Sequence, residues 1–188
     1  MHKKLLYILL LGIALLISCQ SNKSINRISD EGIMYAMIYD FDNTPVSGVA
    51  VYIDEKKVAD SDIQGRFILD NMKKGEYSVR LSKRGYETFE ENFNFDPLQV
   101  LYFKMINTAQ LTALAEEMLD NREFAAAENY INRALQLEPM RPDILFLKSI
   151  ACYLQGKNEE AVEILESLAK SNSNNPSILQ LLEKIRQE

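Results

Sequence analysis

The chain has 188 residues, 47% of them hydrophobic, and its 21 basic residues face 27 acidic ones, which gives a formal net charge of −6. This length allows one medium-sized domain or two small ones. The acidic balance argues against a nucleic-acid partner, because such a partner requires a basic surface.

The chain begins with an apolar run, Leu5–Ile17, which holds 13 uncharged residues. A helix that crosses a bilayer needs roughly 20 residues, so this run is too short. Lys3 and Lys4 precede it and the small residue Ser18 follows it. A positive start, an apolar middle and small residues at the end are typical of a secretory signal, so we predict a signal peptide over residues 1–18.

The four residues Leu16-Ile17-Ser18-Cys19 resemble the lipobox of bacterial lipoproteins. In that family the cysteine thiol carries diacylglycerol, the signal is cut just before it, and the new amino group is acylated, for example with palmitate. The resemblance implies lipidation of Cys19 and a membrane-anchored envelope protein, since several acyl chains hold a protein on a membrane where one would not. In a two-membrane bacterium, Gln20 rather than Asp after the lipidated cysteine implies sorting to the outer membrane. The other interpretation is an ordinary signal peptide followed by an incidental cysteine.

Cleavage before Cys19 would leave 170 residues with 19 basic and 27 acidic ones, a formal charge of −8. It would also remove His2, the only histidine, and leave Cys152 as the only unmodified thiol. Neither a Ser-His-Asp triad nor a Cys-His pair can then form, and zinc sites that need His or paired Cys are excluded. We therefore expect no enzyme, cofactor or metal; an enzyme that uses carboxylates in a cleft between domains is the alternative.

Residues 19–31 are mostly polar, and we interpret them as the lipidated N-terminus and a flexible tether. As a coil, 11 residues span roughly 20 Å. The alternative is that they add an edge strand to a sheet.

From Gly32 to Met105 the hydrophobic pattern has a period of two, interrupted by turn sequences such as DNTP at 42–45 and DIQG at 62–65. This pattern predicts short strands that form an antiparallel β-sandwich over residues 32–106. The expected strands are Ile33–Asp40, Gly48–Ile53, Lys57–Asp60, Arg66–Leu69, Glu76–Lys83, Tyr86–Phe95 and Gln99–Lys104.

The same region resembles the carboxypeptidase regulatory-like domain and the related PEGA module of envelope proteins. The resemblance depends on Pro45-Val46-Ser47-Gly48 before a strand, on Asp62-x-x-Gly65-Arg66-Phe67, on Gly75-x-Tyr77 and on Gly85-Tyr86. It implies a module without catalytic residues that serves as a platform, spacer or binding surface.

After Met105 the period becomes helical. Leu111, Leu114, Ala115 and Met118 form one stripe, and Phe124, Ala127, Ile131, Ala134 and Leu135 form the next. With Asn107 or Thr108 as the cap and Pro139 at the end, these positions resemble a tetratricopeptide repeat of 34 residues.

A second repeat begins at Pro142, with Leu145, Ser149, Gly156, Ala161 and Leu165 in matching places, and it departs from the pattern at Lys148 and Leu168. The segment from Pro176 is interpreted as a capping helix. The expected fold is thus α+β and multidomain, with the β-sandwich followed by a short α-α solenoid of two repeats and a cap over residues 107–188.

In this family the inner surface of the first helix of each repeat binds a peptide. The resemblance places Thr112, Glu116, Leu119 and Asp120 on that surface in the first repeat, and Phe146, Ile150, Tyr153 and Leu154 in the second. The apolar members, Leu119 and the four residues of the second repeat, form the predicted protein-binding groove, because aromatic and apolar side chains dominate binding hot spots. The alternative is that the capping helix or the sandwich covers them.

We therefore expect a lipid-anchored adaptor in the cell envelope, at the outer membrane, which binds a protein or peptide through its repeats. The alternative function is binding of a cell-wall polymer or another carbohydrate by the β-sandwich.

Overall fold

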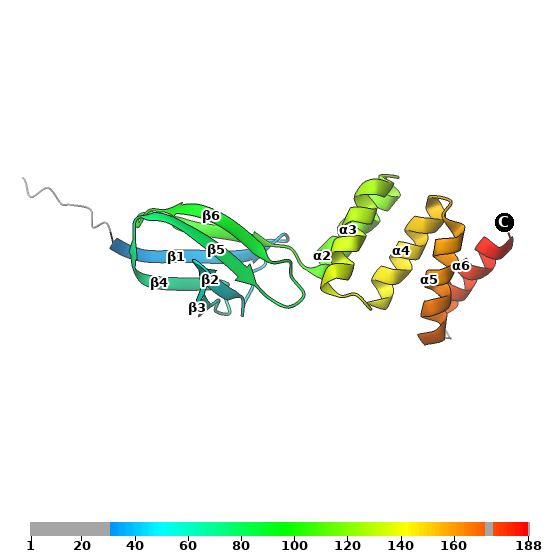
Figure 1. Ribbon diagram of the computed structural model, residues 1–188, viewed down its shortest axis with the longest axis horizontal. Coiled ribbons are helices and arrows are strands. Elements are labelled where there is room, and N and C mark those ends of the chain that lie inside the picture. Colours follow the sequence, from blue (N-terminus) through cyan, green and yellow to red (C-terminus); the bar gives the residue numbers. More distant parts are fainter. Residues whose placement is uncertain (1–30, 172–174, 188) are drawn as a thin grey trace, which may run out of the picture.

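The computed structural model describes residues 31–171 and 175–187 of the chain. The predicted signal peptide, Cys19 and the tether up to residue 30 lie outside the described residues. The molecule is elongated, with a β-sandwich at one end and a series of helices at the other (Figure 1).

The sandwich consists of two sheets. The first has the strand order β4-β1-β7 and the second the order β3-β2-β5-β6. The strands are β1 (Glu31–Asp40), β2 (Ala50–Ile53), β3 (Lys56–Asp60), β4 (Arg66–Lys73), β5 (Gly75–Ser82), β6 (Phe89–Phe95) and β7 (Val100–Met105).

The alternation in the sequence determines which side of each strand is buried. Met34, Ala36 and Ile38 of β1 are fully buried, and they meet Val51 of β2 and Leu81 of β5 in one core between the sheets. Burial of such side chains contributes about 1.5–3 kcal/mol each. The expected β-sandwich is confirmed.

One feature of the predicted sandwich is wrong: β1 and β7 run parallel, with Tyr35 opposite Val100 and Asp40 opposite Met105, while the other strand pairs are antiparallel. A period of two reports which face is buried but carries no information on strand direction. The strand predicted to begin at Tyr86 begins at Phe89, because Tyr86 pairs instead with Asn107, just before the first helix.

The described residues after β7 form five helices: α2 (Thr108–Asp120), α3 (Phe124–Leu137), α4 (Pro142–Leu154), α5 (Asn158–Ser171) and α6 (Pro176–Gln187). Asn107 caps α2 as expected: its side chain accepts from the Gln110 backbone N–H at 2.9 Å, and the Gln110 side chain accepts from the Asn107 N–H at 3.2 Å. This reciprocal capping box satisfies two N–H groups that the helix leaves without a partner.

Residues 34 positions apart in the two repeats occupy equivalent buried places. Ala115 and Ser149, which correspond under this shift, are both fully buried, and so are Ala127 and Ala161. Small side chains at these places let paired helices approach closely. Lys148, which departs from the repeat pattern, lies near Glu160 of α5 at 3.5 Å and forms an ion pair there.

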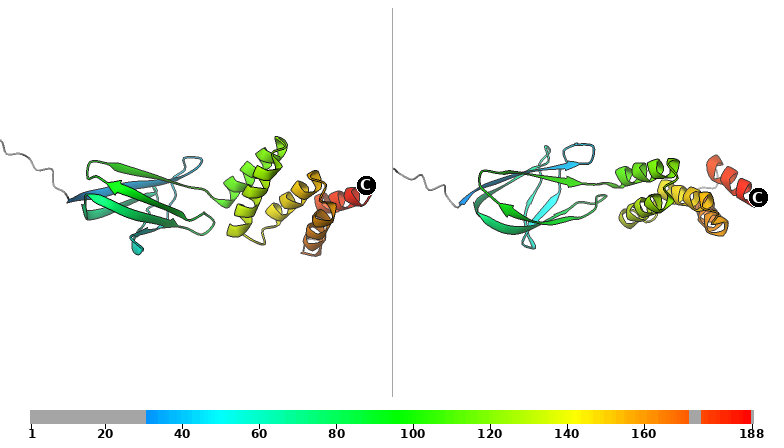
Figure 2. Two further views of the ribbon diagram at one scale, coloured as in Figure 1. Left: turned by 45° about the horizontal axis from the view of Figure 1, so that its top comes forward. Right: turned by 90° about the horizontal axis from the view of Figure 1, so that it is seen from above.

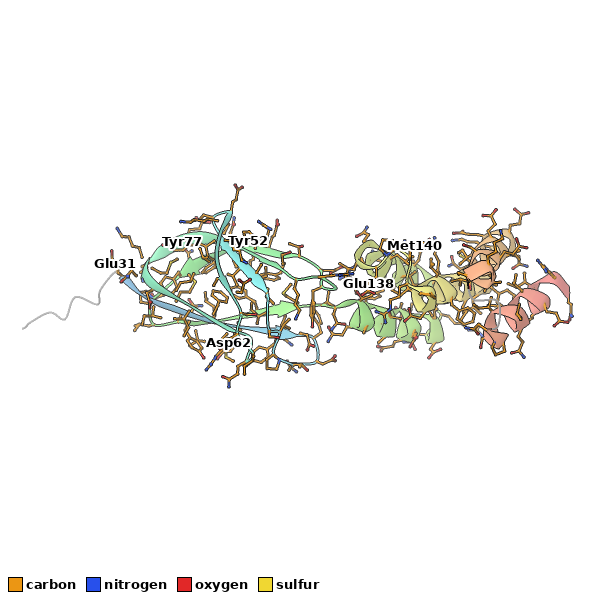
Figure 3. The ribbon with its side chains drawn as sticks, turned by 90° about the horizontal axis from the view of Figure 1, so that it is seen from below. Glu31, Tyr52, Asp62, Tyr77, Glu138 and Met140 are labelled. Carbon is orange, nitrogen blue, oxygen red and sulfur yellow. The ribbon has the colours of Figure 1, made fainter. Side chains whose placement is uncertain are left out.

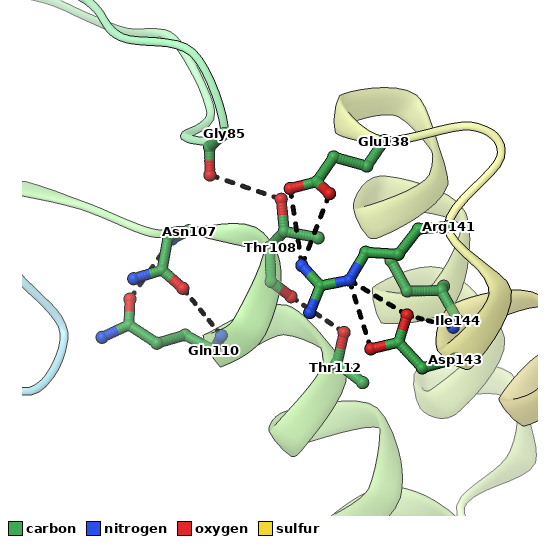
Figure 4. Close-up of polar contacts among 9 residues, drawn as sticks. All are labelled: Gly85, Asn107, Thr108, Gln110, Thr112, Glu138, Arg141, Asp143 and Ile144. Carbon is green, nitrogen blue, oxygen red and sulfur yellow. Dashed lines mark hydrogen bonds and ion pairs between the residues drawn. The ribbon is translucent and has the colours of Figure 1, made fainter.

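The sandwich and the helices are joined by direct contacts (Figure 4). The Thr108 hydroxyl and backbone N–H both donate to the Gly85 carbonyl, at 3.3 and 3.1 Å. The Gln110 amide donates to the Asp42 carboxylate at 2.5 Å, which ties α2 to the loop after β1. Because Met105 ends β7 and Thr108 starts α2, only two residues separate the two parts.

Candidate protein-binding site

Four of the five predicted groove residues lie on α4, and we call Phe146, Ile150, Tyr153 and Leu154 the α4 face. The structure leaves them exposed to different degrees. Leu154 is 47% exposed, while the other three are half-buried. The hydrophobic cluster of the first repeat contacts Ile150, and the cluster of the second repeat and α6 contacts Phe146 and Tyr153.

Helix α6 follows α5 at the C-terminal end of the series of helices (Figure 2), and it shares a hydrophobic cluster with the α4 face. Its side chains Ile178, Leu182 and Ile185 are buried in the cluster against which Phe146 and Tyr153 pack. The Lys184 ammonium lies 5.0 Å from the centre of the Tyr153 ring. The capping helix therefore covers part of the predicted groove, and Leu154 is its most accessible member.

Leu119 is the fifth groove residue, and its predicted exposure is wrong. Its side chain is 7% exposed and belongs to the core cluster of α2, α3 and α4. That cluster includes Ile144 and Leu147 of α4, so the side of α2 that carries Leu119 packs against the next repeat. The other three first-repeat positions are more open, since Glu116 and Asp120 are exposed and the Thr112 hydroxyl donates to the Thr108 carbonyl at 2.9 Å.

Two depressions that the sequence does not indicate lie where the sandwich meets the helices. One, of about 460 Å³, lies between the loop after β1 and α2, with Phe41, Ala109, Ala113 and Leu114 in its lining. The other, of about 710 Å³, lies beside the α3–α4 turn, where Met140 is 81% exposed. Both join residues that are far apart in sequence, so no local motif indicated them.

The α3–α4 turn is held by charged side chains (Figure 4). The Arg141 guanidinium donates to Asp143 at 3.0 Å and reaches Glu138 at 3.4 Å. These hydrogen bonds raise the pKa of Arg141 above its ordinary value, chiefly through Asp143. The turn therefore presents a fixed, charge-paired rim next to Met140.

Three side chains that could carry chemistry, Cys152, Asp60 and Asp62, have structural surroundings in the described residues. Burial raises the pKa of the Cys152 thiol, and the side chain is only 5% exposed, so it behaves as a core residue. Asp62 and Asp60 pair with Arg66 and Lys57, respectively. No group of three metal-binding side chains occurs among the residues that the structure describes.

Comparison with family models assigns the two parts of the chain. Residues 43–108 match the model of the PEGA domain, and residues 118–185 match that of the tetratricopeptide repeat. The chain contains a PEGA domain followed by tetratricopeptide repeats. Both families are non-catalytic, and the repeats support a role in protein interaction.

A search of curated proteins found no match. Among solved structures, a streptococcal ancillary pilin shares 19% identity over 42% of this chain and 30% of its own, with a TM-score of 0.36. A 3-chlorocatechol 1,2-dioxygenase from Rhodococcus opacus 1CP shares 11% identity over 41% of this chain and 59% of its own, with a TM-score of 0.29. The chain thus spans less than two thirds of either protein.

Proposed function

We propose that this protein is a lipid-anchored adaptor of the cell envelope that binds a protein partner through the α4 face. The observation that carries this proposal is the exposed side chain of Leu154 on α4, the helix that also carries the half-buried rings of Phe146 and Tyr153. Apolar and aromatic side chains at one site favour a binding hot spot. They stand where tetratricopeptide repeats bind peptides.

The arrangement of the two domains supports this role. Glu31, where the described chain begins, lies at the end of the PEGA domain that is remote from the helices (Figure 3). An acylated Cys19 would therefore hold the PEGA domain near the membrane and the repeats farther along the molecule. The short connection through Ile106 and Asn107 would limit how far the repeats swing.

Anchoring through Cys19 is the proposed means of membrane attachment. None of the helices in the described part of the chain has the length and apolar character needed to cross a bilayer. The lipobox-like residues 16–19 support acylation, and Gln20 supports sorting to an outer membrane. Mass spectrometry of the protein from its native membrane tests this part: a chain that still carries Met1, or lacks lipid at Cys19, would contradict it.

The α4 face is tested by photocrosslinking in intact cells. A photoreactive amino acid at position 154 should give a discrete crosslinked product, because Leu154 is exposed beside the predicted site. The matched control is position 63 in the PEGA domain, where Ile63 is 87% exposed. Equal products at both positions, or none at position 154, would contradict the assignment.

A charge at the same place gives a second test. Leu154→Arg should abolish capture of the crosslinked partner while the circular dichroism of the protein stays unchanged, since the side chain is half exposed. If the intact chain instead binds peptidoglycan and Leu154→Arg leaves this binding unchanged, the cell-wall function of the β domain is favoured over the adaptor.

A further inference from the structure

The outer face of the β4-β1-β7 sheet carries apolar and aromatic side chains where solvent-facing residues are usually polar. The outward residues of the central strand β1 are Ile33, Tyr35, Met37 and Tyr39. Ile33 is 56% exposed, and the other three are half-buried by their neighbours in the sheet.

The two flanking strands extend this surface, as the pairing register shows. Ile68 of β4 and Val100 of β7 stand on either side of Tyr35, and Tyr102 of β7 stands beside Met37. They are 53%, 43% and 67% exposed, respectively. We call these seven residues of the three strands the β1 face. Scattered single apolar residues are normal on a surface, whereas contiguous apolar patches of a few hundred Å² are often functional.

The outer face of the other sheet is different. Its outward residues include Ser78 and Arg80 of β5 and Glu90 and Asn92 of β6, and Arg80 lies 3.7 Å above the ring of Tyr52. Tyr52 of β2 and Val58 of β3, which is 37% exposed, are apolar exceptions in this sheet, so the apolar character is more extensive on the β1 face.

The size of the β1 face argues against a second copy of the chain as its occupant. Three strands about 4.8 Å apart and seven residues long at about 3.3 Å per residue cover roughly 300 Å². Two such faces would bury roughly 600 Å², whereas a stable interface buries at least about 1,200 Å². An occupant that is held nearby by another link can bind through a smaller surface, because the link raises its effective concentration.

The chain that precedes β1 supplies such a link. Residues 20–30 connect Cys19 to Glu31 and can span at most about 40 Å. Glu31, which follows this segment, begins β1, and β1 is the central strand of the sheet that carries the β1 face. At the same end, Leu98 is 79% exposed, and Pro97 next to it lies against Gly32.

We infer that the β1 face rests on the lipid bilayer to which Cys19 is anchored, an inference that depends on the proposed anchoring. Tyrosine rings suit the interface between headgroups and acyl chains, where one end is apolar and the other hydrated. Lys104 of β7 stands beside Tyr39 at the edge of the face, and a long cationic side chain can reach lipid phosphates while its stem stays in apolar contact. Arg66, opposite Met37, is paired with Asp62. The long axis of the molecule then runs along the membrane.

A single tryptophan makes this contact measurable, because the sequence contains none. The chain 19–188 is coupled through the Cys19 thiol to a maleimide lipid in phosphatidylcholine vesicles that contain brominated acyl chains. The buried Cys152 reacts slowly, so coupling is selective. Chemical coupling supplies the anchor itself, so a negative result here is distinct from a failure of native acylation.

In these vesicles the tryptophan of Tyr102→Trp on the β1 face should emit at a shorter wavelength, and the brominated acyl chains should quench its fluorescence. The matched control, Tyr52→Trp on the other sheet, should show neither. Adding Ile68→Glu to Tyr102→Trp should restore the fluorescence while circular dichroism remains unchanged, because Ile68 is exposed and its loss leaves the core intact.

Three results would overturn the inference. Equal quenching of both tryptophans, or of neither, would show that the β1 face makes no special lipid contact. A dimer mass by light scattering, with Tyr102→Trp already blue-shifted before coupling, would assign the face to a second copy. Retention of the uncoupled chain on peptidoglycan, abolished by Ile68→Glu, would assign it to a polysaccharide.

Discussion

Arg133 of α3 and Glu87 of the PEGA domain form a two-pronged ion pair across the junction of the domains. The guanidinium donates Nε to one carboxylate oxygen at 2.8 Å and a terminal nitrogen to the other at 2.7 Å. Both side chains are about two-thirds buried, and the pairing raises the pKa of Arg133. Such a planar, bidentate pair fixes the relative orientation of the two side chains as well as the distance between them. The backbone N–H of Glu87 also donates a hydrogen bond to the Ile106 carbonyl at 3.0 Å.

Breaking this pair should loosen the junction without unfolding either domain. For Arg133→Met we expect the free energy of unfolding to fall by only about 1 kcal/mol, because the ion pair is partly solvated and water screens part of its attraction. NMR relaxation should then report separate tumbling of the PEGA domain and the repeats, whereas we expect the unmodified chain to tumble as one body.

The control for the junction is Arg186→Met, which removes an exposed ion pair to Glu166 within the repeats. It should leave the tumbling unchanged. If both variants tumble like the unmodified chain, the ion pair does not hold the two domains together.

Gly65 is required where the turn before β4 meets β1. Its φ is +73°, and an added Cβ would collide with the carbonyl oxygen of Ile38 and come within 3.1 Å of the Val46 nitrogen. Gly65→Ala should lower the free energy of unfolding by about 2–5 kcal/mol, through left-handed strain and overpacking together. Chemical denaturation measures this loss.

Gly48→Ala provides the matched comparison. Gly48 has a similar φ of +65°, but nothing lies within 4 Å of an added Cβ. Only the strain of about 1–2 kcal/mol should remain. Equal losses in the two alanine variants would mean that the contact with Ile38 relaxes freely.

The features that the sequence could predict are local. Asn107 caps α2 through a residue three positions later, and Ala115, Ala127 and Ala134 occupy buried places because close helix packing admits only small side chains. The alternation in β1 likewise determines its inner face. Each of these depends on neighbours within one or two turns of chain.

The features that the sequence could not predict depend on long-range pairing. Glu87 and Arg133 are 46 residues apart, and neither belongs to a recognisable motif. Leu119 has the apolar character of a groove residue, but its burial depends on where α4 packs. The parallel pairing of β1 with β7 similarly follows from the path of the whole chain and not from its period.

Arg122 and Gly156 occupy corresponding turns of the two repeats, and both have left-handed backbones, with φ of 60° and 75°. Arginine is strained there, whereas glycine is not. Arg122→Gly should raise the free energy of unfolding by roughly 0.5–1 kcal/mol, since relief of about 1–2 kcal/mol of strain exceeds the added flexibility of the unfolded chain. Thermal unfolding measures this gain.

The reverse exchange checks the cause. Gly156→Arg should reduce the stability of the second repeat by a similar amount. A loss of stability in Arg122→Gly would show that the arginine side chain contributes more than its backbone strain removes.

Asp62 should make the stability of the PEGA domain depend on pH. Its carboxylate accepts from the backbone N–H groups of Arg66 and Gln64, at 2.9 and 2.8 Å, and from the Arg66 side chain. These bonds, chiefly those from Arg66, hold the pKa of Asp62 below its ordinary value in the folded chain.

Because the folded pKa is lower than the unfolded one, the stability that the Asp62 carboxylate contributes is complete above the unfolded pKa. It disappears as the pH falls through the folded pKa. Urea unfolding from about pH 5 to pH 2 should therefore show a steeper acid loss in the unmodified chain than in Asp62→Asn, which has no proton to gain. Parallel curves for the two proteins would show that this turn does not couple protonation to folding.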